Sequence, residues 1–110
     1  RPARVAVLSA RVGSIGDNRL GGWISYRAAK AALNQILRTS AIELARSHPH
    51  LSCFALHPGT VDTPLTRPFS AKYDALPAPE AAAKLHHVIE VREAHETGQF
   101  FDQKGHIVPW

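Results

Sequence analysis

The sequence predicts an α/β protein with a parallel sheet. Two short, mostly apolar runs at residues 4–9 and 51–56 have the length of buried strands, residues 98–102 are expected to form a last strand, and long helical patterns separate the three segments. Strands that alternate with helices in this way are typical of parallel sheets, because a crossover is needed to return the chain in the same direction. Three strands and two long helices are too few to cover both faces of such a sheet. Since the first residue is also not Met, we expect the 110 residues to be the C-terminal part of a larger domain.

The first half of the chain contains a strand, a loop and the longest helical pattern. Residues 4–9 are mostly apolar and include β-branched side chains, whereas residues 11–22 are rich in Gly, Ser, Asp and Asn and indicate a loop. The helical pattern runs from Ile24 to about Ser47, and its apolar residues cover more than one stripe. A helix of this kind is normally buried on two sides. We expect one side to cover the sheet and the other to contact a partner subunit.

The second half begins after Pro49, which cannot continue the helix. Its expected elements are a strand at 51–56, a turn and loop at 57–64, a loop at 65–79 with a short helix near 66–71, a helix from Pro79 to about Ala94, and a strand at 98–102. Pro79 and Glu80 favour a helix start, because Pro fits the first turn and an acid there complements the helix dipole.

Composition argues against several classes of protein. The net charge of +4 comes from scattered Lys and Arg without a basic run, which favours a solvated surface over a nucleic-acid interface or a small basic interaction module. No apolar run approaches the ~20 residues of a membrane span, and no secretory leader is visible. The single Cys53 lies in an apolar run and is expected to be a buried hydrophobe in a cytoplasmic protein. His86 and His87 diverge by about 100° on a helix, so no metal site is expected.

The segment from Ser25 to Asn34 carries the strongest chemical signal. Tyr26 and Lys30 are four residues apart in an Ala-rich helical segment, so their side chains lie on one face of the helix. A nearby cation favours the phenolate form of a phenol, which makes a tyrosine a usable proton donor and acceptor near neutral pH. By itself this spacing also occurs by chance on many helices, so a chemical role for the pair depends on its surroundings.

Three motifs in order supply these surroundings. The strand V-A-V-L-S is followed by G-S-I, then by Tyr26-x-x-x-Lys30 with A-A-L-N, and then by a second strand with H-P-G-T-V-D-T-P. In this order the chain resembles the short-chain dehydrogenase/reductase family, and the segment from Arg11 to Lys30 looks like its C-factor and carbonyl-reductase-like group. The resemblance extends over essentially all 110 residues. It implies that residues 1–110 are the C-terminal half of one Rossmann-type, doubly wound, NAD(P)-binding domain.

The resemblance also implies a role for each motif. Tyr26 would be the general acid or base of hydride transfer between a nicotinamide and a small carbonyl or alcohol, and Lys30 would activate it and bind the nicotinamide ribose. The residues implied to line the nicotinamide pocket are Pro58, Gly59, Val61 and Thr63. They follow a strand, at the edge where open α/β sheets bind ligands. The loop from Leu65 to Tyr73 would cover the substrate, and the helix of Tyr26 would build a homodimer or homotetramer.

Two departures from the family pattern limit these expectations. The family carries a Ser-Ser pair whose second serine polarises the carbonyl, and here the pair reads Ser9-Ala10. Strand alternation turns Ser9 the other way, so Ser14 in the next loop is the candidate substitute and the third expected catalytic residue. The Gly-rich phosphate loop, the catalytic Asn and the residue that selects NADH or NADPH are not among these residues. We therefore expect the chain alone to bind cofactor weakly and to be inactive.

Two functions stay open at this point. The first is a short-chain oxidoreductase that uses NAD(P). The second is a family member that binds cofactor, turns over little and acts in signalling or sensing, which the methyl group of Ala10 favours.

Overall fold

The computed structural model describes residues 2–62 and 75–110. Within these residues, the main sheet consists of three parallel strands in the order β1 (Ala3–Leu8), β2 (Leu51–His57) and β5 (Gln99–Asp102). All three strands run in one direction, so their carboxyl ends meet at one edge of the sheet. This arrangement confirms the predicted parallel α/β architecture.

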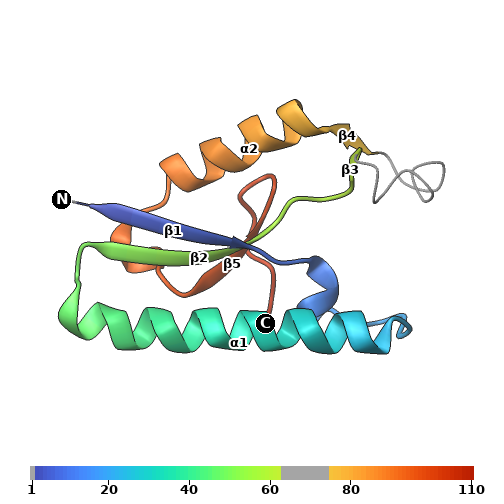
Figure 1. Ribbon diagram of the computed structural model, residues 1–110, viewed down its shortest axis with the longest axis horizontal. Coiled ribbons are helices and arrows are strands. Elements are labelled where there is room, and N and C mark those ends of the chain that lie inside the picture. Colours follow the sequence, from blue (N-terminus) through green and yellow to red (C-terminus); the bar gives the residue numbers. More distant parts are fainter. Residues whose placement is uncertain (1, 63–74) are drawn as a thin grey trace.

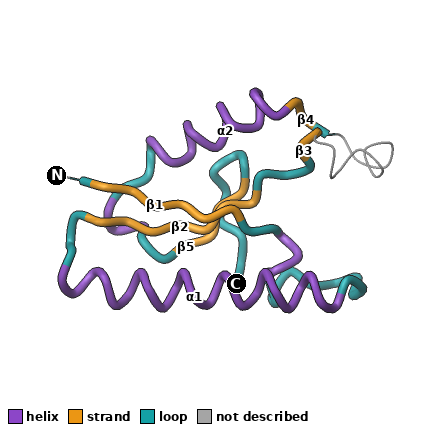
Figure 2. The backbone as a smooth tube through the Cα atoms, viewed as in Figure 1, coloured by secondary structure: helices purple, strands orange, loops and turns teal. Residues whose placement is uncertain are grey.

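One long helix lies on each face of this sheet, and β1 stays partly uncovered, as expected for so few helices, because Val5 and Leu8 expose 47% and 59% of their surface. Helix α1 (Ile24–Ser47) lies along one face and helix α2 (Ala78–Glu90) lies over the other, as Figure 1 shows. The bounds of α1 agree with the predicted helix. It ends where Pro49 and His50 form a turn, and β2 follows directly (Figure 2).

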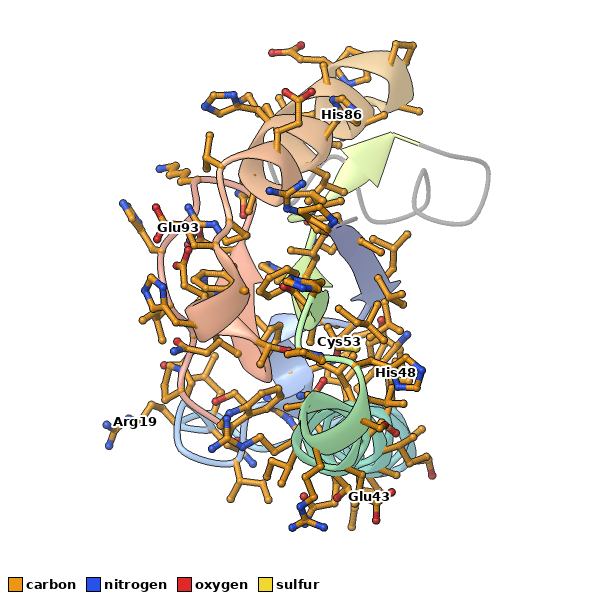
Figure 3. The ribbon with its side chains drawn as sticks, turned by 90° about the vertical axis from the view of Figure 1, so that its left-hand side faces the viewer. Arg19, Glu43, His48, Cys53, His86 and Glu93 are labelled. Carbon is orange, nitrogen blue, oxygen red and sulfur yellow. The ribbon has the colours of Figure 1, made fainter. Side chains whose placement is uncertain are left out.

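The central strand β2 is buried on both faces. Cys53 and Ala55 belong to the core cluster under α1, whereas Phe54 and Leu56 belong to the cluster under α2. This alternation follows from the two-residue period of a strand. The other buried members of the two clusters are Leu37, Ala41, Phe100 and Val108 on the α1 side, and Val88 and Phe101 on the α2 side. Figure 3 shows Cys53 inside the molecule and the charged side chain of Glu43 on its outside.

Helix α1 buries only one of its two apolar faces against the described residues. Asn34, Leu37 and Ala41 point into the molecule and are buried. On the outer side, Ile24 and Ile36 expose 84% and 64% of their surface. The expected cover of the sheet by α1 is therefore confirmed, and the expected contact with a partner subunit stays a prediction. Neither helix of the described residues combines the length and apolar character that a membrane span needs.

Helix α2 ends earlier than predicted, at Glu90 instead of about Ala94. The guanidinium Nε of Arg92 donates a hydrogen bond of 3.1 Å to the carbonyl of Val88, which satisfies an acceptor in the last turn. Glu93 and Glu96 then form a capping box that starts a short 3-10 helix (Ala94–Glu96). These polar contacts terminate the helix without the Gly or Pro that usually marks a helix end.

The segment after β2 contains a second, smaller sheet where the sequence predicts only a turn and loop. Strand β3 (Val61–Asp62) pairs in parallel with β4 (Leu76–Pro77). Most of the predicted loop at 65–79, including the short helix expected near 66–71, lies outside the described residues.

Candidate active site

Helix α1 brings Tyr26 and Lys30 together near its N-terminal end. The Nζ of Lys30 lies 5.8 Å from the centroid of the Tyr26 ring, within the range of a cation–π contact. The same Nζ donates a hydrogen bond of 3.4 Å to the carbonyl of Leu8, the last residue of β1. Tyr26 is 46% exposed, so a ligand can reach its ring. The ammonium therefore connects an accessible phenol to the carboxyl edge of the sheet.

The start of α1 is held by backbone geometry and by Arg27. Gly21 and Gly22 have positive φ angles, and Trp23 takes the left-handed conformation with φ 57° directly before the first helical residue. The guanidinium of Arg27 donates hydrogen bonds of 2.8 Å and 3.1 Å to the carbonyls of Gly22 and Gly21. The rings of Trp23 and Tyr26 are 6.5 Å apart. These contacts determine where the first turn, with Tyr26 in it, leaves the loop.

Ser9 at the end of β1 is turned toward α1. Its buried hydroxyl donates a hydrogen bond of 2.5 Å to Oδ1 of Asn34, one helical turn after Lys30. Ala10 follows in an extended conformation and is also buried. Ser9 therefore fastens the strand to the helix, and its hydroxyl is engaged in that contact.

Ser14 follows the short 3-10 helix after β1 (Arg11–Gly13) and contacts the C-terminal residues. Its hydroxyl donates a hydrogen bond to the carbonyl of Pro109 and accepts one of 3.1 Å from the backbone N–H of Asp17. Only 1% of the residue is exposed. In this arrangement the hydroxyl is committed to the loop, and contact with a substrate requires the loop to move. The catalytic role of Ser14 stays a prediction.

His57 ends β2 and links it to the loop after β1. Its Nδ1 accepts a hydrogen bond of 2.9 Å from the backbone N–H of Arg11. Burial and then the positive charge of Arg11 lower the pKa of His57 to about 4, against an opposing effect of Asp102. The imidazole is therefore neutral near pH 7, which leaves Nδ1 able to accept the Arg11 bond.

The turn at Pro58 and Gly59 continues from β2 at the same edge of the sheet. Gly59 has a φ of +74°, and a Cβ atom built on it would lie only 2.9 Å from Nε2 of Gln103. Glycine therefore suits this position both in conformation and in space. The Oε1 of Gln103 is buried and has no hydrogen-bond partner among the described residues. An unused acceptor thus lies directly beside Gly59.

Arg11 joins the loop after β1 to the end of β5. Its guanidinium forms ion pairs of 3.2 Å with Asp102 and 3.4 Å with Asp17. Burial raises the pKa of Asp102, but hydrogen bonds from the backbone N–H groups of His106 and Lys104, with the charges of His106 and Arg11, outweigh it and leave the pKa below its usual value. The carboxylate therefore stays ionised and holds the turn after β5.

The structure brings some of the predicted site residues together and separates others. Tyr26 and Lys30 are neighbours, and the turn of Pro58 and Gly59 lies at the same edge of the sheet as the carbonyl that Lys30 binds. Val61 follows in β3, and Thr63 lies outside the described residues. Among the described residues, no group of three His, Cys, Asp or Glu side chains is placed to hold a metal ion.

Sequence reasoning missed four residues that hold this edge together. His57 stood inside a recognised motif, where its place at a strand end was an available signal. Arg11 and Asn34 also stood inside segments that carried the resemblance, whereas Gln103 has no local signal of its role.

Known proteins are similar to this sequence over nearly its whole length. No protein-family model matches the chain. It is 35% identical over 108 residues to 1-hydroxy-2-glutathionyl-2-methyl-3-butene dehydrogenase of Rhodococcus sp. (strain AD45), covering 98% of this chain and 47% of that protein. It is 37% identical over 107 residues to C-signal of Myxococcus xanthus, covering 97% of this chain and 61% of that protein. The chain thus spans about half the length of these curated relatives.

Two solved structures share the fold. Carbonyl reductase Sniffer of D. melanogaster superimposes with a TM-score of 0.85 at 27% identity, over 98% of this chain and 41% of that chain. NADPH-bound carbonyl reductase from chicken fatty liver superimposes with a TM-score of 0.84 at 31% identity, over 98% of this chain and 43% of that chain. Together with the ordered strand, Tyr-Lys helix and Pro-Gly turn, these likenesses lead to one conclusion: the homologues of this chain are short-chain dehydrogenases/reductases, and the chain spans part of their length.

Proposed function

We propose that the complete protein carrying this chain is an NAD(P)-dependent oxidoreductase that transfers hydride between a nicotinamide and a small carbonyl or alcohol. The observation that carries the proposal is the position of Lys30 Nζ, 5.8 Å from the Tyr26 ring and 3.4 Å from the carbonyl of Leu8. A reachable phenol with a cation beside it, at the carboxyl edge of a parallel sheet, suits proton transfer to a bound carbonyl. The named activities of the dehydrogenase and carbonyl reductase relatives support the same chemistry.

In this proposal the two helix residues divide the work. Tyr26 donates a proton to the carbonyl oxygen during reduction and accepts one from the alcohol during oxidation. Lys30 stabilises the phenolate that remains after donation, because a cation nearby favours the charged form of a phenol. By resemblance to the family, Lys30 also binds the ribose hydroxyls of the cofactor.

The residues at the end of β2 fit a nicotinamide. The absence of a side chain on Gly59 lets the Gln103 amide approach closely, and the buried Oε1 of that amide is an acceptor without a partner among the described residues. A carboxamide carries N–H donors that such an acceptor can bind. The residues proposed to hold the ring are Pro58, Gly59, Val61 and Thr63. The cofactor, when bound, supplies or takes up the hydride, and NADPH in the chicken structure supports NAD(P) as its class.

We further propose that residues 1–110 are the C-terminal half of one NAD(P)-binding domain. The exposed edge of β1 supports this assignment, since Val5 and Leu8 expose 47% and 59% of their surface there. Strands of parallel sheets are normally covered on both faces, so apolar side chains on β1 fit a position inside a wider sheet.

A second candidate function is a cofactor-binding protein with little turnover that acts in signalling or sensing. The observation that favours it is the methyl group of Ala10 where the family carries a hydroxyl, combined with the burial of the Ser14 hydroxyl against Pro109. Loss of one such donor costs about 10²–10³ in turnover in comparable sites. The two candidates therefore differ in kcat far more than in cofactor affinity.

The outer face of α1 is the proposed subunit interface. Ile24, Ile36 and Ile42 expose 84%, 64% and 46% of their surface on this helix. Burying them against the same helix of a second copy forms a two-fold contact, which makes a homodimer or homotetramer the proposed assembly.

A cytoplasmic location is also part of the proposal. The single Cys53 is buried, and burial raises the pKa of its thiol above the usual value. A protonated, enclosed thiol fits a compartment in which cysteines stay reduced.

Oxidation of NADPH and NADH by the complete protein, measured against a panel of aldehydes and ketones, tests the proposed function. Tyr26→Phe removes only a hydroxyl and is expected to lower kcat by about 10²–10⁴-fold, the usual size of general acid catalysis. Lys30→Met is expected to lower it as well. Lys84→Met, which removes a Lys from the exposed side of α2, is the matched control and should leave kcat/KM unchanged. Cofactor binding without turnover in the unchanged protein would favour the second candidate.

A further inference from the structure

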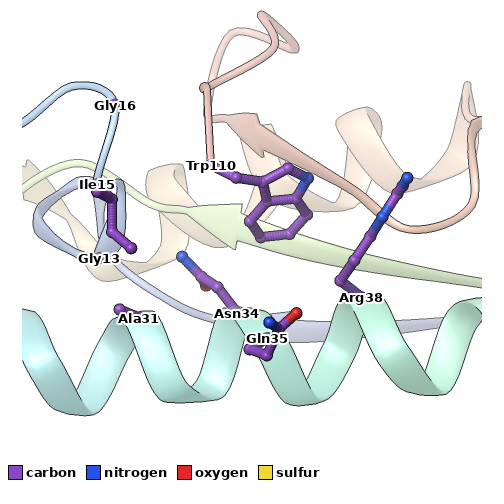
Figure 4. Close-up of a pocket in the computed structure, with 8 residues that line it drawn as sticks. All are labelled: Gly13, Ile15, Gly16, Ala31, Asn34, Gln35, Arg38 and Trp110. Atoms are coloured by element: carbon purple, nitrogen blue, oxygen red, sulfur yellow. The ribbon is translucent and has the colours of Figure 1, made fainter.

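A separate pocket lies between α1, the loop after β1 and Trp110. Its volume is about 370 Å³, within the range of small-molecule sites. Figure 4 shows its walls: the helix forms the floor, with Ile15 on one side and Trp110 and Arg38 on the other. Neither Tyr26 nor Lys30 lines it, so it is distinct from the candidate active site.

Asn34 points into this pocket with an unsatisfied donor. The residue is 3% exposed, and its Oδ1 already accepts the hydrogen bond from Ser9. Its Nδ2 is buried and has no hydrogen-bond partner among the described residues. Figure 4 shows the amide nitrogen directed into the space between Ile15 and Trp110. Because leaving a buried donor unpaired is unfavourable, a ligand acceptor at this position would be stabilised.

Arg38 supplies the charge of the pocket. One N–H of its guanidinium donates a hydrogen bond of 3.1 Å to the carbonyl of Gly98, which holds the side chain beside Trp110. A guanidinium has five N–H donors, so this single bond leaves others suited to a carboxylate. The charged group in the lining is thus positive, and the buried unpaired group is a donor.

Trp110 forms a rigid apolar wall. Its indole stacks on Phe100 with ring centroids 5.5 Å apart, and its carbonyl accepts hydrogen bonds of 2.6 Å and 3.2 Å from the backbone N–H groups of Ile15 and Gly16. A wall held by these contacts does not have to become ordered when a ligand binds, which favours affinity.

We propose that this pocket binds a small carboxylic acid with a planar apolar body. The body lies against Trp110, Ile15 and Ala31, the carboxylate binds the guanidinium of Arg38, and an acceptor oxygen pairs with Nδ2 of Asn34. A cationic ligand does not suit this lining, because it would face Arg38 and leave the Asn34 donor unpaired. The site goes beyond the proposed oxidoreductase activity and does not depend on it.

The test is a titration of the full chain with benzoate and, as its neutral counterpart, benzamide. Amide and indole N–H signals in two-dimensional NMR spectra report on Asn34 and Trp110 separately. Benzoate is expected to shift both signals saturably and to bind roughly tenfold or more tightly than benzamide, which is the scale of one charge-assisted contact. No saturable shift, equal affinity for both compounds, or shifts confined to other residues would overturn the proposal.

Two variants and a control locate the site. Arg38→Gln is expected to weaken benzoate binding roughly tenfold and to leave benzamide binding unchanged. Arg46→Gln removes the same charge from the exposed last turn of α1, outside the pocket, and should leave benzoate binding within about twofold. Ala31→Leu fills the pocket without altering charge and is expected to abolish binding, so it decides the question even if Arg38→Gln does not fold. Unchanged benzoate binding in Ala31→Leu contradicts the assignment.

Discussion

Gly13 lies so close to Lys30 that a Cβ atom built on Gly13 would stand 2.8 Å from the Cβ of Lys30 and 2.9 Å from its carbonyl carbon. A side chain at position 13 would therefore meet both a backbone atom and a side-chain atom of Lys30. A change of the Lys30 rotamer alone could not relieve this clash. Gly13 belongs to the turn directly after Ala10, so this contact sets how near the end of β1 comes to the Tyr26 and Lys30 pair. The spacing of strand and helix at the candidate site depends on the absence of one methyl group.

Gly13→Ala is accordingly expected to destabilise the chain by about 1–3 kcal/mol, the usual penalty for overpacking. Gly16→Ala is the matched control, because a Cβ there would meet Pro109 at an ordinary distance of 3.5 Å and Gly16 has no positive φ. Urea unfolding followed by circular dichroism gives both free energies of unfolding. If the two substitutions cost the same, the close approach to Lys30 does not limit this loop.

Placing a serine hydroxyl at Ala10, where the family carries one, tests the proposed chemistry by a gain of activity. Ala10→Ser in the complete protein is expected to raise kcat by about 10²-fold, because one polarising donor is worth roughly that much in comparable sites. The same substitution in a Tyr26→Phe background should produce no such gain, since the introduced hydroxyl assists a proton transfer that then no longer occurs. Steady-state kinetics of the single and double variants decide the point. An equal gain in both backgrounds would mean that the introduced hydroxyl acts on folding or binding.

Ser14→Ala separates a catalytic from a structural role of that hydroxyl. The bonds to Pro109 and Asp17 predict a loss of about 1–3 kcal/mol in the free energy of unfolding, because burying their unpaired groups is costly. The sequence-based expectation adds a loss of kcat/KM under conditions where the variant is fully folded. Thermal unfolding and kinetics measured on the same preparation distinguish the two. Wild-type kcat/KM in the folded variant would remove Ser14 from the catalytic residues.

Much of the fold could be predicted because its signals are local. The helix from Ile24 to Ser47 is dense in Ala and Leu and is followed by Pro49. Neighbouring residues therefore indicate both that the segment is helical and where the helix ends. Strand β2 is a nearly continuous apolar run, with Ser52 and His57 as its polar residues, as is typical of a strand covered on both faces. By contrast, β3 and β4 have two residues each, too short for any periodicity to mark them.

The candidate site likewise contains residues that local sequence patterns predict and residues that they do not. Tyr26 and Lys30 lie on one helix, so their spacing alone brings them together. Ser14 meets Pro109 across 95 positions of the chain, and such a contact depends on how the C-terminal residues return beside the loop. Nothing near Gln103 in the sequence indicates that its amide packs beneath Gly59. Pairings between distant residues are set by the packed fold, and short sequence patterns do not encode them.

The outer face of α1 predicts self-association. Ile36→Lys places a charge in the proposed two-fold contact and is expected to shift the complete protein to monomers, because like charges would meet across the symmetry axis. Ile107→Lys is a close control, since Ile107 is 65% exposed against 64% for Ile36 but belongs to the segment after β5 and not to this helix. Sedimentation velocity over a range of concentrations gives both assemblies. A protein that stays monomeric before any substitution would rule out this interface.

His57 predicts a stability change between pH 4 and 6.5. The unfolded chain has an ordinary His pKa near ~6.5, whereas burial and Arg11 lower the pKa of folded His57 to about 4. Between these values the unfolded chain binds more protons, so the free energy of unfolding rises with pH. The stabilisation is therefore complete above about pH 6.5 and is lost as the pH falls toward about 4. Its size is roughly 3 kcal/mol at most.

His57→Asn isolates this contribution. The Asn amide oxygen can accept the Arg11 N–H in place of Nδ1 but does not titrate, so the variant should lose less stability than the unchanged chain between pH 6.5 and 4. His87→Gln, on the exposed side of α2, should leave the pH dependence as it is. Urea unfolding at several pH values supplies the slopes. Parallel profiles for His57→Asn and the unchanged chain would show that burial and the charge of Arg11 do not lower the pKa of His57 in the folded chain.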